Sequence, residues 1–116
     1  EHSLDAGKNF VATGPCGPWL VTADEIPEPG KLNLKTRLNG QVLQDGNTSD
    51  FIFDIPAMVS YISTFTPLSP GDIIATGTPQ GVGFARKPPS GRKPGDWGES
   101  EVERIGVLRN RVVAEQ

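Results

Sequence analysis

The sequence predicts an α+β domain that is predominantly β and carries one amphipathic helix. The 116-residue chain contains 14 glycines and 11 prolines and is 35% hydrophobic, a composition typical of short strands joined by many turns. Apolar and polar residues alternate over residues 32–38, directly before an Asn-Gly pair. A later segment, residues 55–65, has apolar residues at helical spacing. The length allows one domain at most.

The first elements expected along the chain form a β-hairpin. Residues 28–30, Glu-Pro-Gly, are typical of a turn, and residues 32–38 have the two-residue period of a half-buried strand. Asn39 and Gly40 both tolerate the left-handed conformation that a type I′ turn requires. We therefore expect a return strand over residues 41–44 and a polar turn over residues 45–50, which includes Asn47 and Asp50 as turn and capping residues.

A helix is expected next. Asp54 can cap its N-terminus, Pro56 fits its first turn, and Pro67 and Pro70 end it. Its apolar face is predicted to pack on the sheet and consists of Ile55, Met58, Val59, Ile62 and Phe65.

Three strands are expected after the helix. Asp72 is predicted to act in a turn, residues 73–75 to form a buried strand, and residues 101–107 and 108–113 to form the last two strands.

Charge and cysteine content exclude several classes of function. A net charge of −3 argues against a nucleic-acid-binding domain, which needs an excess of lysine and arginine. Cys16 is the only cysteine, so no internal disulfide is possible and a cytoplasmic location is expected. No apolar run has the length of a membrane span, and no signal peptide is visible. Because the chain begins at Glu1, we also expect it to be part of something longer.

A loop rich in glycine and threonine is the strongest candidate for ligand binding. Gly77, Gly81 and Gly83 can adopt positive φ, so their amide groups can approach an anion closely. Thr76 and Thr78 add hydroxyl donors. The loop can therefore hold a carboxylate or a phosphate, although an ordinary glycine-rich turn between two strands explains the same residues.

Taken in order, the motifs of the chain resemble the C-terminal half of the catalytic domain of the fumarylacetoacetate hydrolase family. The matching segments are Gly7-Lys8-Asn9-Phe10, Gly14-Pro15, Gly17-Pro18-Trp19, Asn39-Gly40, Gln44 to Asp50, Pro70-Gly71-Asp72, Thr76 to Pro79, Gly81-Val82-Gly83, Lys93 to Asp96 and Gly106 to Asn110. Each segment alone is weakly specific, whereas the ordered set is highly specific.

The resemblance implies a mixed β-sandwich roll, incomplete here at its N-terminal side, and a homodimer. It also implies a hydrolase or isomerase of 2-oxo acids such as acylpyruvates or oxo-dienoates, in aromatic-compound catabolism, with decarboxylation still open. Its cofactor would be Mg²⁺, or Mn²⁺ or Ca²⁺, beside which an enolate is stabilised. Lys8 corresponds to the active-site lysine of the family, and Thr78 with Gly77 to the substrate-binding Thr-Gly-Thr motif.

Parts of the family pattern are absent. The metal ligands of the family, a Glu-x-Glu pair and an aspartate, lie upstream of Gly7, and the lid with a histidine and a glutamate is missing, so no metal ligand is assigned to this chain. An Asp-Thr pair that follows the lysine in many members reads Val11-Ala12 here. Trp97-Gly98 and Ser100 interrupt a usually valine-rich strand, so that strand is expected to be weaker or bulged.

Two interpretations follow. In the favoured one, residues 1–116 are part of a longer metal-dependent catalytic domain. The alternative is a truncated, inactive module for small-molecule binding or dimerisation that lacks the metal ligands. Outside the family pattern, a lysine such as Lys8 is usually a solvated surface charge.

Overall fold

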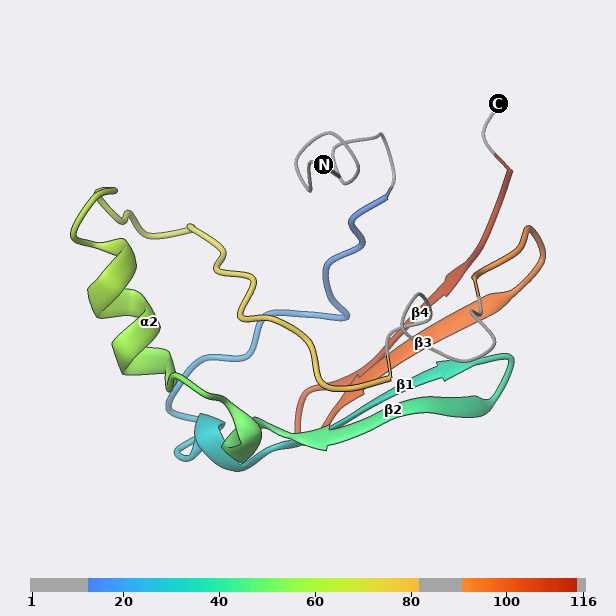
Figure 1. The fold of residues 1–116 in the computed structure, drawn as a ribbon, viewed down its shortest axis with the longest axis horizontal. Helices are drawn as coiled ribbons and strands as arrows, with labels where there is room; N and C mark the ends of the chain where they lie inside the picture. The colour runs from blue at the N-terminus through green and yellow to red at the C-terminus, as the bar shows by residue number, and fades with distance from the viewer. Residues whose placement is uncertain (1–12, 82–90, 115–116) are drawn as a thin grey trace.

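A computed structural model describes residues 13–81 and 91–114 of the chain (Figure 1). The described elements are η1 (Pro29–Lys31), β1 (Asn33–Leu38), β2 (Gln41–Asn47), η2 (Thr48–Asp50), α2 (Ile55–Ile62), β3 (Trp97–Val102) and β4 (Gly106–Arg111). The prediction of a predominantly β fold is confirmed, with one α-helix among the described residues. None of the described helices has the length and apolar character needed to cross a bilayer.

The strands form one open antiparallel sheet in the order β2-β1-β3-β4. The central strand β1 pairs with β2 through a tight hairpin and with β3, which follows the helix in the chain. Since β2 and β4 lie at the edges, the sheet does not close on itself. A second sheet, as in a sandwich, is not found among residues 13–81 and 91–114.

The first hairpin confirms its sequence signal. Asn39 has φ 50° and Gly40 has φ 82°, the two positive values that a type I′ turn requires. The return strand is longer than predicted, because Gly46 and Asn47 pair with β1 instead of turning away. Its register shifts once between Thr36 and Arg37, which is a β-bulge in the β1–β2 pair.

The last hairpin corrects two predictions. Its turn lies at residues 103–105, where Arg104 has φ 64°, and not between Val107 and Leu108 as expected. β3 also pairs with both of its neighbours without a register shift, so the predicted bulge at Trp97-Gly98 is wrong. Cross-strand pairing on both sides holds β3 regular despite its poor strand-forming residues.

Helix α2 begins where the sequence predicts. The Asp54 Oδ1 atom accepts a hydrogen bond of 2.8 Å from the Ala57 N–H, and Pro56 lies in the first turn. The helix ends at Ile62, before Phe65, and none of its residues is buried. It stands apart from the sheet (Figure 1), so the predicted packing of its apolar face on the sheet is wrong.

The segment after α2 runs back toward the sheet without forming a strand (Figure 1). The predicted buried strand at residues 73–75 is therefore wrong, and Ile73 is 79% exposed. An apolar run becomes a strand only when another strand offers it hydrogen-bond partners, and no described strand lies beside this one.

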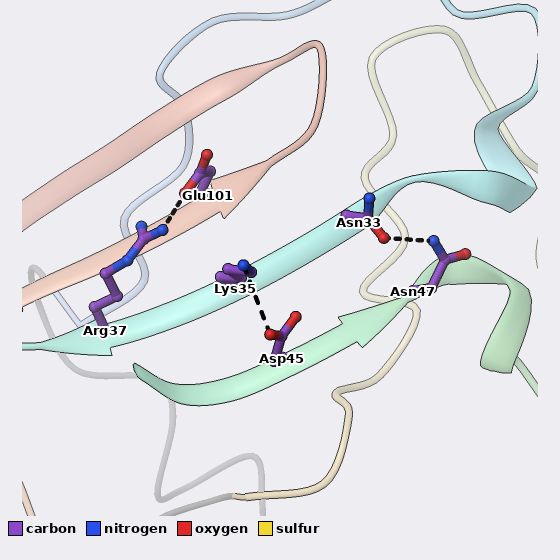
Figure 2. Close-up of polar contacts among 6 residues, drawn as sticks. All are labelled: Asn33, Lys35, Arg37, Asp45, Asn47 and Glu101. Carbon is purple, nitrogen blue, oxygen red and sulfur yellow. Dashed lines mark hydrogen bonds and ion pairs between the residues drawn. The ribbon is translucent and has the colours of Figure 1, made fainter. Parts of the chain in front are cut away.

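The two faces of the sheet differ in chemistry. On one face, Arg37 pairs with Glu101 and Lys35 lies 3.6 Å from Asp45 (Figure 2). Because side chains alternate along a strand, Leu34 of β1 and its partner Val102 of β3 belong to the opposite face. Among the described residues, only Ile26 and Leu32 are buried apolar side chains.

Candidate functional site

A cavity of about 510 Å³ lies against the face of the sheet that carries Leu34 and Val102. The turn after β2 forms one wall and includes Phe51, while the segment of residues 76–79 forms another. Met58 of α2 also reaches it. This volume lies within the range of small-molecule sites, and the mixture of apolar walls with a few polar groups is typical of them.

The segment that carries Thr78 is held against β2 by side-chain hydrogen bonds. The Gln44 Nε2 atom donates to Thr78 Oγ1 and to the Pro79 carbonyl oxygen, both at 2.9 Å. Gly77 has φ 107° and Gly81 has φ 101°, which confirms the left-handed backbone predicted for these glycines.

In the turn after β2, which forms a wall of the cavity, the polar side chains stabilise the backbone of the turn itself. Asn47 Oδ1 accepts from the Ser49 N–H at 2.9 Å, and Asp50 Oδ2 accepts from the Asn47 N–H at 3.3 Å. This reciprocal pair is a capping box around η2. Thr48 Oγ1 accepts from the Leu32 N–H at 2.8 Å. The predicted turn and capping roles of Asn47 and Asp50 are confirmed.

Asp72 likewise has the turn role predicted for it. Its Oδ2 atom accepts a hydrogen bond of 2.7 Å from the Ser69 N–H, and Gly71 between them has φ 99°. This turn precedes the extended segment that reaches the cavity.

The cavity offers donors for a small anion. Thr76 and Gly77 line it and make no hydrogen bond within the part of the chain that the structure describes. A hydroxyl and a glycine amide beside Thr78 can donate to a carboxylate, and hydrogen bonds to a charged acceptor are stronger than those to a neutral one. The arrangement can bind the anionic end of a small organic acid.

The described residues do not form a metal centre. In residues 13–81 and 91–114, no group of three or more histidine, cysteine, aspartate or glutamate side chains lies close enough to hold an ion. Three described carboxyl groups have a pKa below the ordinary value, because each accepts a hydrogen bond from a side chain. The acceptor and donor are Asp24 and Thr22, Glu28 and Lys31, and Asp96 and Asn39. None of the three carboxyl groups lines the cavity.

The structure brings together only some of the candidate residues. Gly77 and Thr78 lie side by side at the cavity. Lys8, the Val11-Ala12 departure and Gly83 lie outside the described residues. The sequence did not point to Gln44 as a partner of Thr78, since only the two-residue alternation along β2 indicates which face its side chain occupies.

Comparisons with known proteins agree with these motifs. Residues 2–113 match the family described as fumarylacetoacetate (FAA) hydrolase C-terminal. The chain is 46% identical over 107 residues to the oxaloacetate tautomerase FAHD2A, mitochondrial, of Bos taurus, covering 92% of this chain and 34% of that protein.

Two solved structures have the same fold. One is maleylpyruvate hydrolase from Sphingobium sp. SYK-6 in complex with manganese (II) ion and pyruvate, with a TM-score of 0.78 and 38% identity over 86% of this chain and 35% of that one. The other is 5-carboxymethyl-2-hydroxymuconate delta-isomerase from Mycobacterium smegmatis, with a TM-score of 0.74 and 40% identity over 86% of this chain and 36% of that one. The chain thus spans about a third of the length of each protein.

Proposed function

The chain belongs to the fumarylacetoacetate hydrolase family, and on that premise we propose that residues 1–116 form the C-terminal part of the catalytic domain of a 2-oxo acid hydrolase or isomerase. The observation that carries the proposal is the cavity of about 510 Å³ with the Thr76-Gly77-Thr78 segment on its wall. The reactions in the names of its relatives, hydrolysis, isomerisation and tautomerisation, support this class of activity.

In this proposal the Thr78 hydroxyl and the Gly77 amide bind the carboxylate of an acylpyruvate or oxo-dienoate. Both donors line the cavity, and a hydrogen bond to a charged acceptor is stronger than one to a neutral acceptor. The 2-oxo group lies on the carbon next to this carboxylate. The ammonium group of Lys8 stabilises the negative charge that develops there as the substrate becomes an enolate.

A divalent cation, Mg²⁺ or Mn²⁺ or Ca²⁺, belongs to the proposal through the family, and manganese is present in one related structure. The described residues do not fit such an ion, because their carboxylates are dispersed. We therefore assign its ligands to other segments of the protein. A role in aromatic-compound catabolism, a homodimer and a cytoplasmic location also stay predictions, although the Bos taurus relative is named as mitochondrial.

The proposal is tested by steady-state kinetics of the whole catalytic domain on acylpyruvates, with Mg²⁺ or Mn²⁺ present. We expect Lys8→Met to lower kcat by about a hundredfold or more, because one preorganised charge at the enolate is lost. Thr78→Val should raise KM by about tenfold, since a hydroxyl donor to the carboxylate is removed.

Lys35→Met provides the matched control. Lys35 lies on the opposite face of the sheet and pairs with Asp45 there (Figure 2), so this substitution should leave both constants unchanged. Unchanged kinetics in the Lys8→Met variant would overturn the assignment of Lys8. Equal losses in the Lys8→Met and Lys35→Met variants would show that the effect is general to lysine removal.

A further inference from the structure

Gln44 of β2 holds the segment that carries Thr78 through two hydrogen bonds from its side chain. Its Nε2 atom donates to Thr78 Oγ1 and to the Pro79 carbonyl oxygen, both at 2.9 Å. A carbonyl oxygen can only accept, so the amide nitrogen of Gln44, and not its oxygen, must face the segment. Both hydrogens of this amide group are then in use, and the orientation of the side chain is determined.

The direction of the Thr78 hydroxyl follows from this contact. A hydroxyl group has one hydrogen to donate and two lone pairs that accept. Because Gln44 donates to Thr78 Oγ1, the hydroxyl acts there as an acceptor and keeps its own hydrogen for another partner. Thr78 lines the cavity, and no described residue takes that hydrogen.

We propose that Gln44 is a positioning residue that directs the hydroxyl hydrogen of Thr78 into the cavity, so that the site selects a carboxylate, which can only accept. The inference rests on the proposed function, in which Thr78 binds the substrate carboxylate. A side chain that accepted from Thr78 would capture this hydrogen and turn a lone pair toward the ligand, which repels an anion.

A close contact between Gly46 and the Pro79 side chain places the segment within reach of Gln44. A Cβ atom at Gly46 would lie 3.0 Å from Pro79 Cβ, so the segment rests directly on β2. Gln44 and Gly46 share one face of the strand, while Asp45 between them lies 3.6 Å from Lys35 on the other face (Figure 2). In the Gln44-Asp45-Gly46 run, the first and third residues therefore contact the Thr78 segment on one face, and the second forms an ion pair on the other.

The test is a double-mutant cycle on the whole catalytic domain proposed above, with Mn²⁺ present, pyruvate as the probe and its affinity measured by calorimetry. Gln44→Met keeps the length of the side chain and removes both donors, and it should weaken pyruvate binding about tenfold or more. In the Thr78→Val background the same substitution should change the affinity less than about twofold, because the hydroxyl that Gln44 directs is already gone.

Two further variants make the result specific. Gln44→Glu has the same size but accepts from Thr78, so it should weaken pyruvate binding at least as strongly as Gln44→Met. Gln41→Met, at an exposed position of the same strand, should bind pyruvate normally. Thermal melting of each variant reports whether the fold is kept. Where Gln44→Met fails to fold, Gln44→Glu is compared in the unmodified and Thr78→Val backgrounds, because repulsion by its charge persists in both and the loss of the directed hydroxyl occurs only in the first.

The outcomes distinguish the inference about Gln44 from the proposed role of Thr78 in binding the carboxylate. Equal losses from Gln44→Met in both backgrounds would show a general structural role and overturn the inference. Normal affinity in Gln44→Met together with weak binding in Thr78→Val would overturn the inference and leave the role of Thr78 intact. Normal affinity in Thr78→Val would overturn both.

Discussion

At the scale of single residues, Asp96 and Asn39 join the first hairpin to the beginning of β3. Asn39 Nδ2 donates to Asp96 Oδ1 at 2.9 Å, and the Lys93 N–H donates to Asp96 Oδ2 at 2.7 Å. Asn39 Oδ1 in turn accepts from the Trp97 N–H at 2.9 Å. The hydrogen bond from Asn39, followed by that from Lys93, lowers the pKa of Asp96 below its ordinary value of 3.8.

This contact makes stability depend on pH in a defined direction. Since the pKa of Asp96 is lower in the folded than in the unfolded state, its stabilisation is complete above pH 3.8 and is lost as pH falls through the folded pKa. We expect carboxyl NMR shifts to show Asp96 titrating below 3.8, and Asn39→Gly, which keeps the turn conformation, to raise that pKa. Titration of Asp96 at or above 3.8 in the unmodified protein would contradict the assignment.

At the scale of elements, the β1–β2 hairpin carries the residues that hold the Thr78 segment in place. Its turn sets the register of the pair, and the register places Gln44 opposite Thr36 and Gly46 opposite Leu34. A shift by one residue would move Gln44 to the charged face and leave Thr78 without its support. The geometry of the site thus depends on a turn far from it along the strands.

Gly40 is the position in this turn that is most sensitive to substitution. Its φ of 82° is unfavourable for a residue with a Cβ atom, so Gly40→Ala should lower the free energy of unfolding by roughly 1–2 kcal/mol. Gly30→Ala is the matched control, because Gly30 lacks a positive φ and has open space around it, and should change it by less than about 0.5 kcal/mol. Urea denaturation measures both, and similar losses in the two variants would argue against a strained turn.

At the scale of the whole molecule, the chain exposes far more surface than its mass requires. Its accessible surface is 9689 Å², whereas a compact monomer of 12.4 kDa exposes about 6,100 Å². Its radius of gyration is 15.6 Å, against about 13.4 Å for a compact domain of this length. Large apolar side chains such as Leu20 and Ile52 are 93% and 91% exposed. In the structure of the chain by itself, this surface lacks the cover that a stable core needs.

We therefore expect the 116-residue chain, produced by itself, to bind the dye ANS and to sediment as a particle heavier than 12.4 kDa. Ile52→Ser should reduce the dye fluorescence, because that side chain is almost wholly exposed, whereas Lys31→Ser should leave it unchanged. A monomer of 12.4 kDa that binds no dye would contradict this expectation.

Elements with local signals could be predicted from the sequence, and those that depend on distant partners could not. The turn at Asn39-Gly40 and the cap at Asp54 involve neighbouring residues only, and both were predicted correctly. The extension of β2 to Asn47 and the absence of a strand at residues 73–75 depend on whether another strand lies alongside. Local composition carries no information about that partner.

The fold class, the first hairpin, the helix start and the family could be predicted from the sequence, because each depends on residues close together in the chain or on an ordered set of motifs. Only the folded chain shows which face of the sheet the Thr76-Gly77-Thr78 segment covers and that α2 stands apart from the sheet (Figure 1). Only the folded chain shows that Gln44 supports Thr78, 34 residues further along the sequence. Such contacts form only when the chain folds back on itself, and the alternation of a strand indicates a face without naming what will cover it.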